Sequence, residues 1–407
     1  MALHIENEAN RCLNCKVPMC QKNCPISTPI PHIIQMFKEK KIQEAGKELF
    51  ENNPLSVVCS TVCNHEAQCA GHCVLAKKGT PVQFFNIEHF ISDSFLSRFK
   101  PGDIEKKGKR AAVIGSGPSG LTVSIILALN GYDVTIFERK NNIGGMLRYG
   151  IPEFRLSNTY LDRYKNLLDK LGVQVRLNTT IGGALRIDNL FRDGYSAIFV
   201  GTGAWRPRTL DVEGESLANV HFGVSYLENS LHHTIGETVA IIGMGNVAMD
   251  VARTVFRHGA QRVMLFSRDN TATASSHEMS YASLDGAEFI YGKQIIRITP
   301  EGPVFRNSVF DENGNVTGVG GEEELVKADN VIIAISQRPK DKLILSTDHL
   351  EGTAKGLLIV DENQMTTHPG VFAAGDVVTG PLTVVHAVEG AKRAAVAMMK
   401  YMEQEQK

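Results

Sequence analysis

The residues that could do redox chemistry open the chain: all eight cysteines of the 407-residue sequence lie in its first 73 residues. They form two groups, Cys12-x2-Cys15-x4-Cys20-x3-Cys24-Pro25 and Cys59-x3-Cys63-x5-Cys69-x3-Cys73. A close run of thiolates ending in Cys-Pro is typical of two-cluster ferredoxins, in which the last cysteine binds the other cluster. Four-cysteine zinc sites also contain C-x2-C pairs, but the spacings here are not paired knuckles. The pattern predicts two [4Fe–4S] clusters rather than secreted-type disulfides.

The spacing also suggests how the cysteines divide between the clusters. Cys12, Cys15 and Cys20 are close enough in sequence to share the first cluster, while Cys24 crosses to the second. We expect the second cluster to be completed by Cys63, Cys69 and Cys73. The first cluster then lacks one ligand, and Cys59 is the remaining thiolate.

A glycine-rich turn follows, in the sequence Gly115-Ser116-Gly117-Pro118-Ser119-Gly120. An apolar run precedes it, and a helical segment and a second strand that ends at Glu138 follow it. Gly117 lets backbone N–H groups approach a pyrophosphate at the helix N-terminus, and Glu138 would accept hydrogen bonds from an adenosine ribose. The segment therefore predicts a bound dinucleotide.

The same pattern recurs in residues 238–268, where Gly243, Gly245 and Ala248 form the G-x-G-x-x-A version of the fingerprint. The acid that closes the first copy is replaced by Ser267, followed by Arg268. One chain thus carries two nucleotide-binding folds.

Further positions could contact the first dinucleotide. The pair Gly144–Gly145 would let the backbone approach a flat ring, and Asp376 ends a strand where it could hold a ribityl hydroxyl. Thr383 opens a helix whose N-terminus could stabilise the negative charge of a reduced flavin. The residues expected at the first cofactor are Gly115, Gly117, Pro118, Ser119, Gly120, Glu138, Arg139, Gly145, Met146, Leu147, Arg148, Thr202, Gly203, Gly375, Asp376 and Thr383. Those expected at the second are Gly243, Gly245, Asn246, Val247, Ala248, Ser267 and Arg268.

Composition and order complete the prediction. The net charge of −1 favours neither nucleic acid nor a membrane surface, and no apolar run approaches membrane-spanning length, so we expect a cytoplasmic protein. The fold class is α/β: a helical iron–sulfur domain and two Rossmann-like domains in a glutathione-reductase-like arrangement. The expected boundaries are 1–105 for the cluster domain, 106–235 and 337–407 for the FAD domain, and 236–336 for the NAD(P) domain.

The order of the cysteine segment, GSGPSG, GGMLRYGIPEFRL, GMGNVAMD and VFAAGD resembles the glutamate synthase small (β) subunit family. That family includes the electron-input parts of dihydropyrimidine dehydrogenases and of an NADH-dependent ferredoxin:NADP transhydrogenase. The resemblance covers nearly the whole chain. It implies that Gly115, Gly117, Gly120, Glu138, Gly145 and Asp376 bind FAD, and that Gly243, Gly245, Ala248 and Arg268 bind the nicotinamide nucleotide.

By the same resemblance, NAD(P)H gives a hydride to the flavin, and single electrons pass through the clusters to a catalytic partner subunit that contains FMN. The dihydropyrimidine dehydrogenase type is favoured, with glutamate synthase and transhydrogenase types as alternatives. In relatives, the position of Glu88 resembles a glutamine or glutamate that ligates the first cluster, so Glu88 is preferred over Cys59. NADH is preferred because Arg268 precedes Asp269 and the loop 271–276 has no basic residue.

A thioredoxin-reductase-type enzyme is disfavoured, and two other functions stay open at this point. Thioredoxin-reductase-type enzymes share the paired folds but need a redox C-x-x-C beside the flavin, and no cysteine follows Cys73. A redox-sensing flavin and cluster scaffold without turnover would carry the same motifs. A zinc-stabilised flavoprotein reductase acting alone would differ by lacking cluster absorption.

Overall fold

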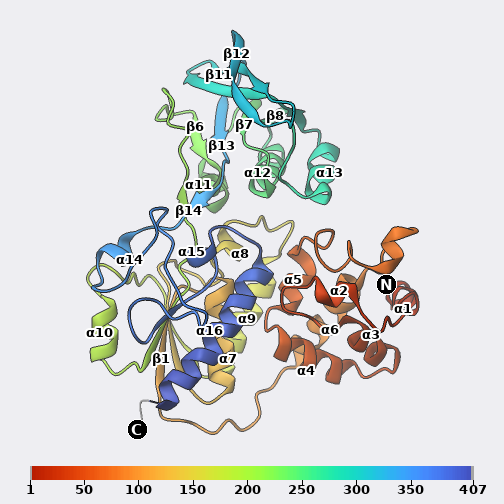
Figure 1. Ribbon diagram of the computed structural model, residues 1–407, viewed down its shortest axis with the longest axis vertical. Helices are drawn as coiled ribbons and strands as arrows, with labels where there is room; N and C mark the ends of the chain where they lie inside the picture. Colours follow the sequence, from red (N-terminus) through yellow and green to blue (C-terminus); the bar gives the residue numbers. More distant parts are fainter. Residues whose placement is uncertain (1, 405–407) are drawn as a thin grey trace. The chain divides into compact units, whose positions relative to one another are not determined.

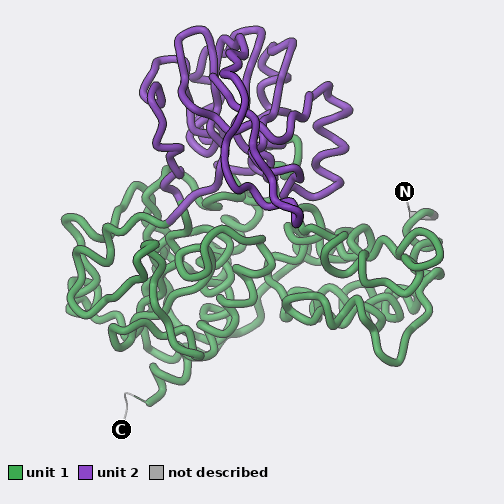
Figure 2. Tube along the Cα trace, turned by 45° about the horizontal axis from the view of Figure 1, so that its top comes forward, with its two compact units in different colours: residues 1–148, 153–204, 339–407 green, residues 149–152, 205–338 purple. Residues whose placement is uncertain are grey.

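A computed structural model describes residues 2–404, which divide into two compact units (Figures 1 and 2). The first comprises residues 2–148, 153–204 and 339–404, and the second residues 149–152 and 205–338. Among the described residues, every helix is too short or too polar to span a membrane.

The first unit begins with a helical cluster domain. Its elements are α1 (Ala2–Asn10), α2 (Met19–Lys22), α3 (Ile30–Lys38), α4 (Ile42–Asn52), α5 (Ser56–Val62), the 3-10 turn η1 (Val74–Lys77) and α6 (Phe84–Arg98). The helical periodicity of residues 30–50 is divided between α3 and α4, because the chain turns at Lys40 with a positive φ of 64°. Ile33, Leu49 and Ile87 are fully buried or nearly so and join α3, α4 and α6 in one core.

The rest of the first unit is a parallel sheet of order β15-β4-β1-β2-β3. Its strands are β1 (Arg110–Ile114), β2 (Asp133–Phe137), β3 (Gln174–Arg176), β4 (Ala197–Val200) and β15 (Val371–Ala373). Helices α7 (Pro118–Leu129) and α16 (Val384–Gln404) pack against each other (Figure 1). The other helices of this part are α8 (Met146–Tyr149), which ends in the second unit, α9 (Asn158–Lys170), α10 (Ile187–Arg192), α14 (Lys342–Leu345) and α15 (Asp376–Thr379).

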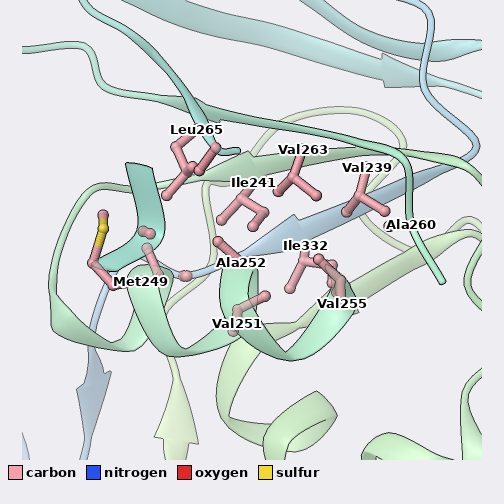
Figure 3. Close-up of a cluster of buried hydrophobic side chains, with 14 of the residues drawn as sticks. Val239, Ile241, Met249, Val251, Ala252, Val255, Ala260, Val263, Leu265 and Ile332 are labelled. Carbon is pink, nitrogen blue, oxygen red and sulfur yellow. The ribbon is translucent and has the colours of Figure 1, made fainter. Parts of the chain in front are cut away.

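The second unit repeats the architecture with a parallel sheet of order β6-β13-β7-β8-β9. Its strands are β6 (Val220–Phe222), β7 (Thr238–Ile242), β8 (Arg262–Phe266), β9 (Glu288–Ile290) and β13 (Asn330–Ile333). The helical elements are α11 (Gly223–Glu228), η2 (Ser230–His232), α12 (Asn246–Arg257) and α13 (Ser276–Leu284). Figure 3 shows Ala252 and Val255 of α12 beside Ile241, Val263 and Ile332 of the sheet.

Two smaller sheets belong to the second unit. An antiparallel sheet is formed by β10 (Lys293–Thr299), β11 (Gly302–Phe310) and β12 (Val316–Leu325). A short ribbon pairs β5 (Arg206–Pro207) with β14 (Gln337–Arg338), near the points where the chain enters and leaves the unit.

The unit boundaries differ from those expected from the sequence. The main segment of the second unit begins at Trp205 rather than at residue 236, because β6 pairs with β13 and adds residues 205–235 to this unit. These residues carry no nucleotide fingerprint, so the earlier boundary could not be predicted from motifs.

Candidate functional site

The first glycine turn lies where β1 passes into α7, in the middle of its sheet. Gly115 has a φ of +99°, and a Cβ there would lie 2.6 Å from the carbonyl oxygen of Gly201, so glycine is required. A Cβ on Gly120 would lie 2.0 Å from the carbonyl oxygen of Gly115, which explains the close packing of helix on strand. At Gly117, by contrast, the only atom within 4 Å of a built Cβ is the Cα of Gly145, at 3.9 Å. This open backbone at the start of α7 fits a pyrophosphate.

The second glycine pair lies directly against this turn. The Gly144 N–H donates to the Ser116 carbonyl oxygen at 3.0 Å, and a Cβ on Gly145 would lie 2.7 Å from the Cα of Gly117. Two segments that are separate in sequence therefore present bare backbone to one place, where a cofactor could approach.

Glu138 is fixed in position at the end of β2. One carboxylate oxygen accepts from the Ser116 N–H at 2.9 Å and from its hydroxyl at 2.6 Å, and the other accepts from the Lys140 N–H at 2.8 Å. The side chain is 5% exposed. The carboxylate is thus oriented beside the turn, where a ribose would donate hydrogen bonds.

The C-terminal segment closes the cradle. A Cβ on Gly375 would lie 3.1 Å from the Ser119 hydroxyl, so Gly375 and Asp376 lie next to the start of α7. Burial raises the pKa of Asp376 to about 6, although the Leu382 N–H donates to its carboxylate at 3.3 Å. Thr383 precedes α16, and its hydroxyl contacts Nδ1 of His386 at 2.6 Å.

The remaining predicted contacts of the first cofactor differ in their settings. Thr202 adjoins the Gly115 turn, Gly203 has a φ of +69°, and Arg139 is exposed. Met146 is half-buried, whereas Leu147 is fully buried and packs into the core. The Arg148 guanidinium donates to the Ile143 carbonyl at 3.0 Å and to Asp162 at 2.5 Å, so it is held by the protein itself.

The second fingerprint has the same geometry in the second unit. A Cβ on Gly243 would lie 2.3 Å from the Ala334 carbonyl oxygen, whereas one on Gly245 would meet only the Thr273 hydroxyl, at 3.4 Å. Ala248 is fully buried and Val247 half-buried, and Asn246 accepts from the Ser275 N–H at 2.9 Å. The open backbone is again at the second glycine.

The residues at the end of β8 lie where the fingerprint places the adenosine ribose of a bound nucleotide. Ser267 is buried and its hydroxyl accepts from the Asp269 N–H at 3.1 Å. Arg268 is exposed, and its Nε lies 3.7 Å from a carboxylate oxygen of Asp269. The guanidinium therefore already has an acidic neighbour.

The cysteines are free thiols that line two neighbouring cavities of the cluster domain. The first cavity is lined by Cys12, Cys15, Cys20, Cys69 and Cys73. The second is lined by Cys24, Cys59, Cys63, Cys69 and Glu88. Cys69 contributes to both linings, so the two sites are adjacent.

This grouping differs from the ligand division expected from the sequence. Cys73 lies with Cys12, Cys15 and Cys20 rather than with Cys24, and Glu88 lies in the second cavity rather than the first. The reason is tertiary: Arg11 donates to the Pro81 carbonyl at 3.2 Å and Glu8 accepts from the Gln83 N–H at 2.9 Å, which returns the segment after Cys73 to the end of α1. The α6 helix packs against α5 and so carries Glu88 to the second cavity.

The electrostatics of both cavities fit metal ligation. Burial raises the pKa of Cys20 to about 11 and that of Cys69 to about 12, and neighbouring thiols add to both shifts. Burial also raises the pKa of Glu88 well above its usual range. Several acidic groups that cannot all ionise in one buried space are stabilised when iron replaces their protons.

The second cavity adjoins the flavin cradle. Val385, in the first turn of α16 and two residues after Thr383, lines it together with Glu88. Hydrogen bonds fix the cluster domain to the flavin domain: Tyr160 Oη lies 3.0 Å from His89 Nε2, Tyr164 donates to the Pro54 carbonyl at 2.7 Å, and Lys392 donates to Asn52. The structure therefore places a cysteine site immediately beside the helix that opens at Thr383.

Comparison with known proteins agrees with this arrangement. Residues 2–99 match the family described as dihydropyrimidine dehydrogenase domain II, 4Fe-4S cluster. Residues 182–391 match the pyridine nucleotide-disulphide oxidoreductase family, and residues 113–157 match the NAD(P)-binding Rossmann-like domain.

Relatives align along almost the entire chain. The glutamate synthase (NADPH) small chain of Escherichia coli is 30% identical over 97% of this chain and 91% of its own length. The NAD-dependent dihydropyrimidine dehydrogenase subunit PreT of the same organism is 32% identical over 97% of this chain and 94% of its own.

Solved structures confirm the fold. Mycobacterium tuberculosis FprA in complex with NADPH has a TM-score of 0.62 at 18% identity, over 73% of this chain and 85% of that one. The thioredoxin reductase of T. acidophilum has a TM-score of 0.56 at 20% identity, over 72% of this chain and 98% of that one. The chain is an NAD(P)H-dependent flavin oxidoreductase subunit with a 4Fe-4S domain, and it belongs to the family of glutamate synthase small chains and PreT dihydropyrimidine dehydrogenase subunits.

Proposed function

We propose that this chain is the electron-input subunit of a dihydropyrimidine dehydrogenase-type complex, and that it accepts hydride from NADH and delivers electrons through two [4Fe–4S] clusters. The observation that carries the proposal is the pair of adjacent cysteine cavities, one of which is lined by Val385 at the start of the flavin-domain helix α16. When bound, FAD supplies the conversion of a two-electron hydride into single electrons.

Residues of this chain would hold and orient the two nucleotide cofactors. Bare backbone at Gly117 and Gly145 would hold the dinucleotide, and the fixed carboxylate of Glu138 would orient its ribose. The backbone N–H groups at the start of α16 would stabilise negative charge beside Thr383. Gly245 would admit the nicotinamide nucleotide in the second unit.

For the clusters we propose Cys12, Cys15, Cys20 and Cys73 as ligands of the first. The second would take Cys24, Cys63, Cys69 and one of two competitors, Glu88 or Cys59. Glu88 is 8% exposed, and within residues 2–404 its carboxyl has no side-chain hydrogen bond or ion pair. Cys59 is buried as well and lines the same cavity. We prefer Glu88, because ligation would give its buried carboxyl a partner, and an oxygen ligand would lower the symmetry of the second cluster.

The choice of NADH rests on the end of β8. A 2′-phosphate is best bound by an unpaired arginine fork, and Arg268 has Asp269 as a neighbour. The loop 271–276, which has no basic residue, folds back so that the N–H groups of Thr273 and Ala274 donate to the Met244 carbonyl at 3.1 and 3.0 Å. No second cation is thereby brought to the ribose position from this loop.

The partner would carry the substrate site, and an FMN-containing catalytic subunit suits an input of single electrons. A dihydropyrimidine dehydrogenase partner is supported by the match of residues 2–99 and by the coverage of PreT. A glutamate synthase large subunit is the second candidate, because the small chain of that enzyme is similar along its length.

The experiment uses the purified holoprotein with each candidate partner. We expect FAD, about eight irons per chain from two four-iron clusters, and NADH-dependent dye reduction, which a sensor without turnover would not give. Uracil reduction should appear only after the dihydropyrimidine dehydrogenase catalytic subunit is added. Uracil reduction or glutamate formation by the isolated chain would contradict the proposal.

A further inference from the structure

Large aliphatic side chains are exposed around the first cysteine cavity. Leu13 is 61% exposed, Val74 44% and Met19 42%, and all three line the cavity that contains Cys12, Cys15, Cys20 and Cys73. Val17, two residues before Met19, is also exposed. Leu13 directly follows Cys12, and Met19 directly precedes Cys20. Neither side chain belongs to the hydrophobic core. Exposed apolar side chains gathered at one place are typical of an interaction site.

The same segments carry only positive charge. Residues 11–24 and 69–78 contain one arginine and four lysines, and neither segment contains an aspartate or glutamate. Lys16, Lys22, Lys77 and Lys78 are exposed, and within residues 2–404 none of them is in an ion pair. Since the whole chain has a net charge of −1, this positive charge is local. The segments that supply the cavity lining therefore combine exposed apolar side chains with a local positive charge.

The two cavities differ in whether the flavin domain contributes to their lining. The second cavity has Val385 of the flavin domain in its lining, whereas every residue that lines the first cavity lies between Cys12 and Phe84. Electrons that enter at the flavin domain would thus leave from the first cavity.

We infer that this basic–apolar surface (Leu13, Val17, Met19 and Val74 with Lys16, Lys22, Lys77 and Lys78) is the docking site for an acidic redox protein that carries an iron–sulfur cluster near its own surface. The inference rests on the proposed function, because it names the surface through which that function reaches its partner. Apolar contact would exclude water between the two clusters, and the lysines would attract and orient the acidic partner. Oxidation of one NADH to NAD+ would supply two electrons, and each electron would reduce one partner cluster by a single charge.

A second copy of this chain fits the surface poorly. A two-fold contact through one patch would place the lysines of one copy against those of the other, and like charges in contact oppose association. An acidic partner has the complementary charge.

The test uses the holoprotein and an acidic bacterial [4Fe–4S] ferredoxin as the probe, with binding followed by calorimetry at low and high salt. We expect the affinity to fall as salt rises, and Leu13→Glu and the double variant Lys16→Glu/Lys77→Glu each to weaken binding about tenfold or more. Leu284→Glu and Lys355→Glu are matched controls, because both residues are exposed and lie outside the surface. They should bind as the unchanged protein does.

The readouts separate this inference from the function on which it rests. Iron content, FAD content and NADH-dependent dye reduction should be unchanged in Lys16→Glu/Lys77→Glu, since neither lysine lines a cysteine cavity and dye can be reduced at the flavin. If NADH fails to produce reduced-cluster EPR signals in the unchanged protein, the proposed function is wrong. If the signals appear but Leu13→Glu and the lysine variant bind ferredoxin normally, the docking surface is wrong. Loss of self-association, or of binding to anionic vesicles, in Leu13→Glu with ferredoxin binding intact would assign the surface to another occupant and overturn the inference.

Discussion

Replacing Gly117 by alanine should weaken FAD binding by about two to four orders of magnitude while leaving the protein folded. In the FAD-free protein a Cβ at this position has only the Cα of Gly145 near it, at 3.9 Å, and the backbone angles of −71° and −172° suit any residue. The substitution should therefore stabilise the apoprotein slightly, by about 0.4–1 kcal/mol, because it restricts the unfolded chain.

The substitution should reduce the affinity for FAD. The added methyl group occupies the space in which the pyrophosphate approaches the backbone. Losing two hydrogen bonds to a charged group, at about 1.5–3 kcal/mol each, amounts to about 3–6 kcal/mol. That difference corresponds to about two to four orders of magnitude in the dissociation constant of FAD.

The assay compares flavin absorbance per chain, FAD affinity of the apoprotein and the urea midpoint. Gly245→Ala is the matched variant, because its Cβ would meet only Thr273 Oγ1 at 3.4 Å. It should retain FAD and raise the KM for NADH. Gly120→Ala should fail to fold, since its Cβ would lie 2.0 Å from a backbone oxygen. Full FAD occupancy in Gly117→Ala, or its failure to fold, would refute this reasoning.

Three further outcomes are expected. Glu88→Ala should lose or alter the EPR signal of one cluster and leave the other, whereas Cys59→Ala should keep about eight irons per chain; the reverse pattern would make Cys59 the ligand. Because burial raises the pKa of Asp376 from 3.8 to about 6, the folded FAD-free protein binds more protons than the unfolded chain between these values. Its stability in urea should therefore fall as pH rises from about 4 to about 6, by up to about 3 kcal/mol, and Asp376→Asn should remove this dependence. The unchanged protein should show a higher kcat/KM with NADH than with NADPH, and Ser267→Arg, which adds a second cation beside Arg268, should narrow the difference; a native preference for NADPH would contradict the assignment.

Local spacing predicted the parts of this protein that lie close together in sequence. The turn at Gly115–Gly120 and its repeat at Gly243–Ala248 are each read within one strand–turn–helix unit, so their positions followed from the sequence. The two parallel sheets were predicted for the same reason. The boundary at Trp205 was not, because it depends on the pairing of β6 with β13, more than one hundred residues later.

The cysteines show where sequence reasoning ends. Their number, their types and the presence of two groups indicated two clusters, because thiolate chemistry and short spacing are local properties. Which thiols share a cavity depends on how the chain returns: the contacts of Arg11 and Glu8 with residues 81–83 carry Cys73 to Cys12, and the packing of α6 on α5 carries Glu88 to Cys63. The sequence by itself determined which chemical groups are available to this protein. Only the tertiary structure decided which cysteine and glutamate side chains lie together and which cavity lies beside the flavin domain, because long-range packing sets the distances between residues that are far apart in sequence.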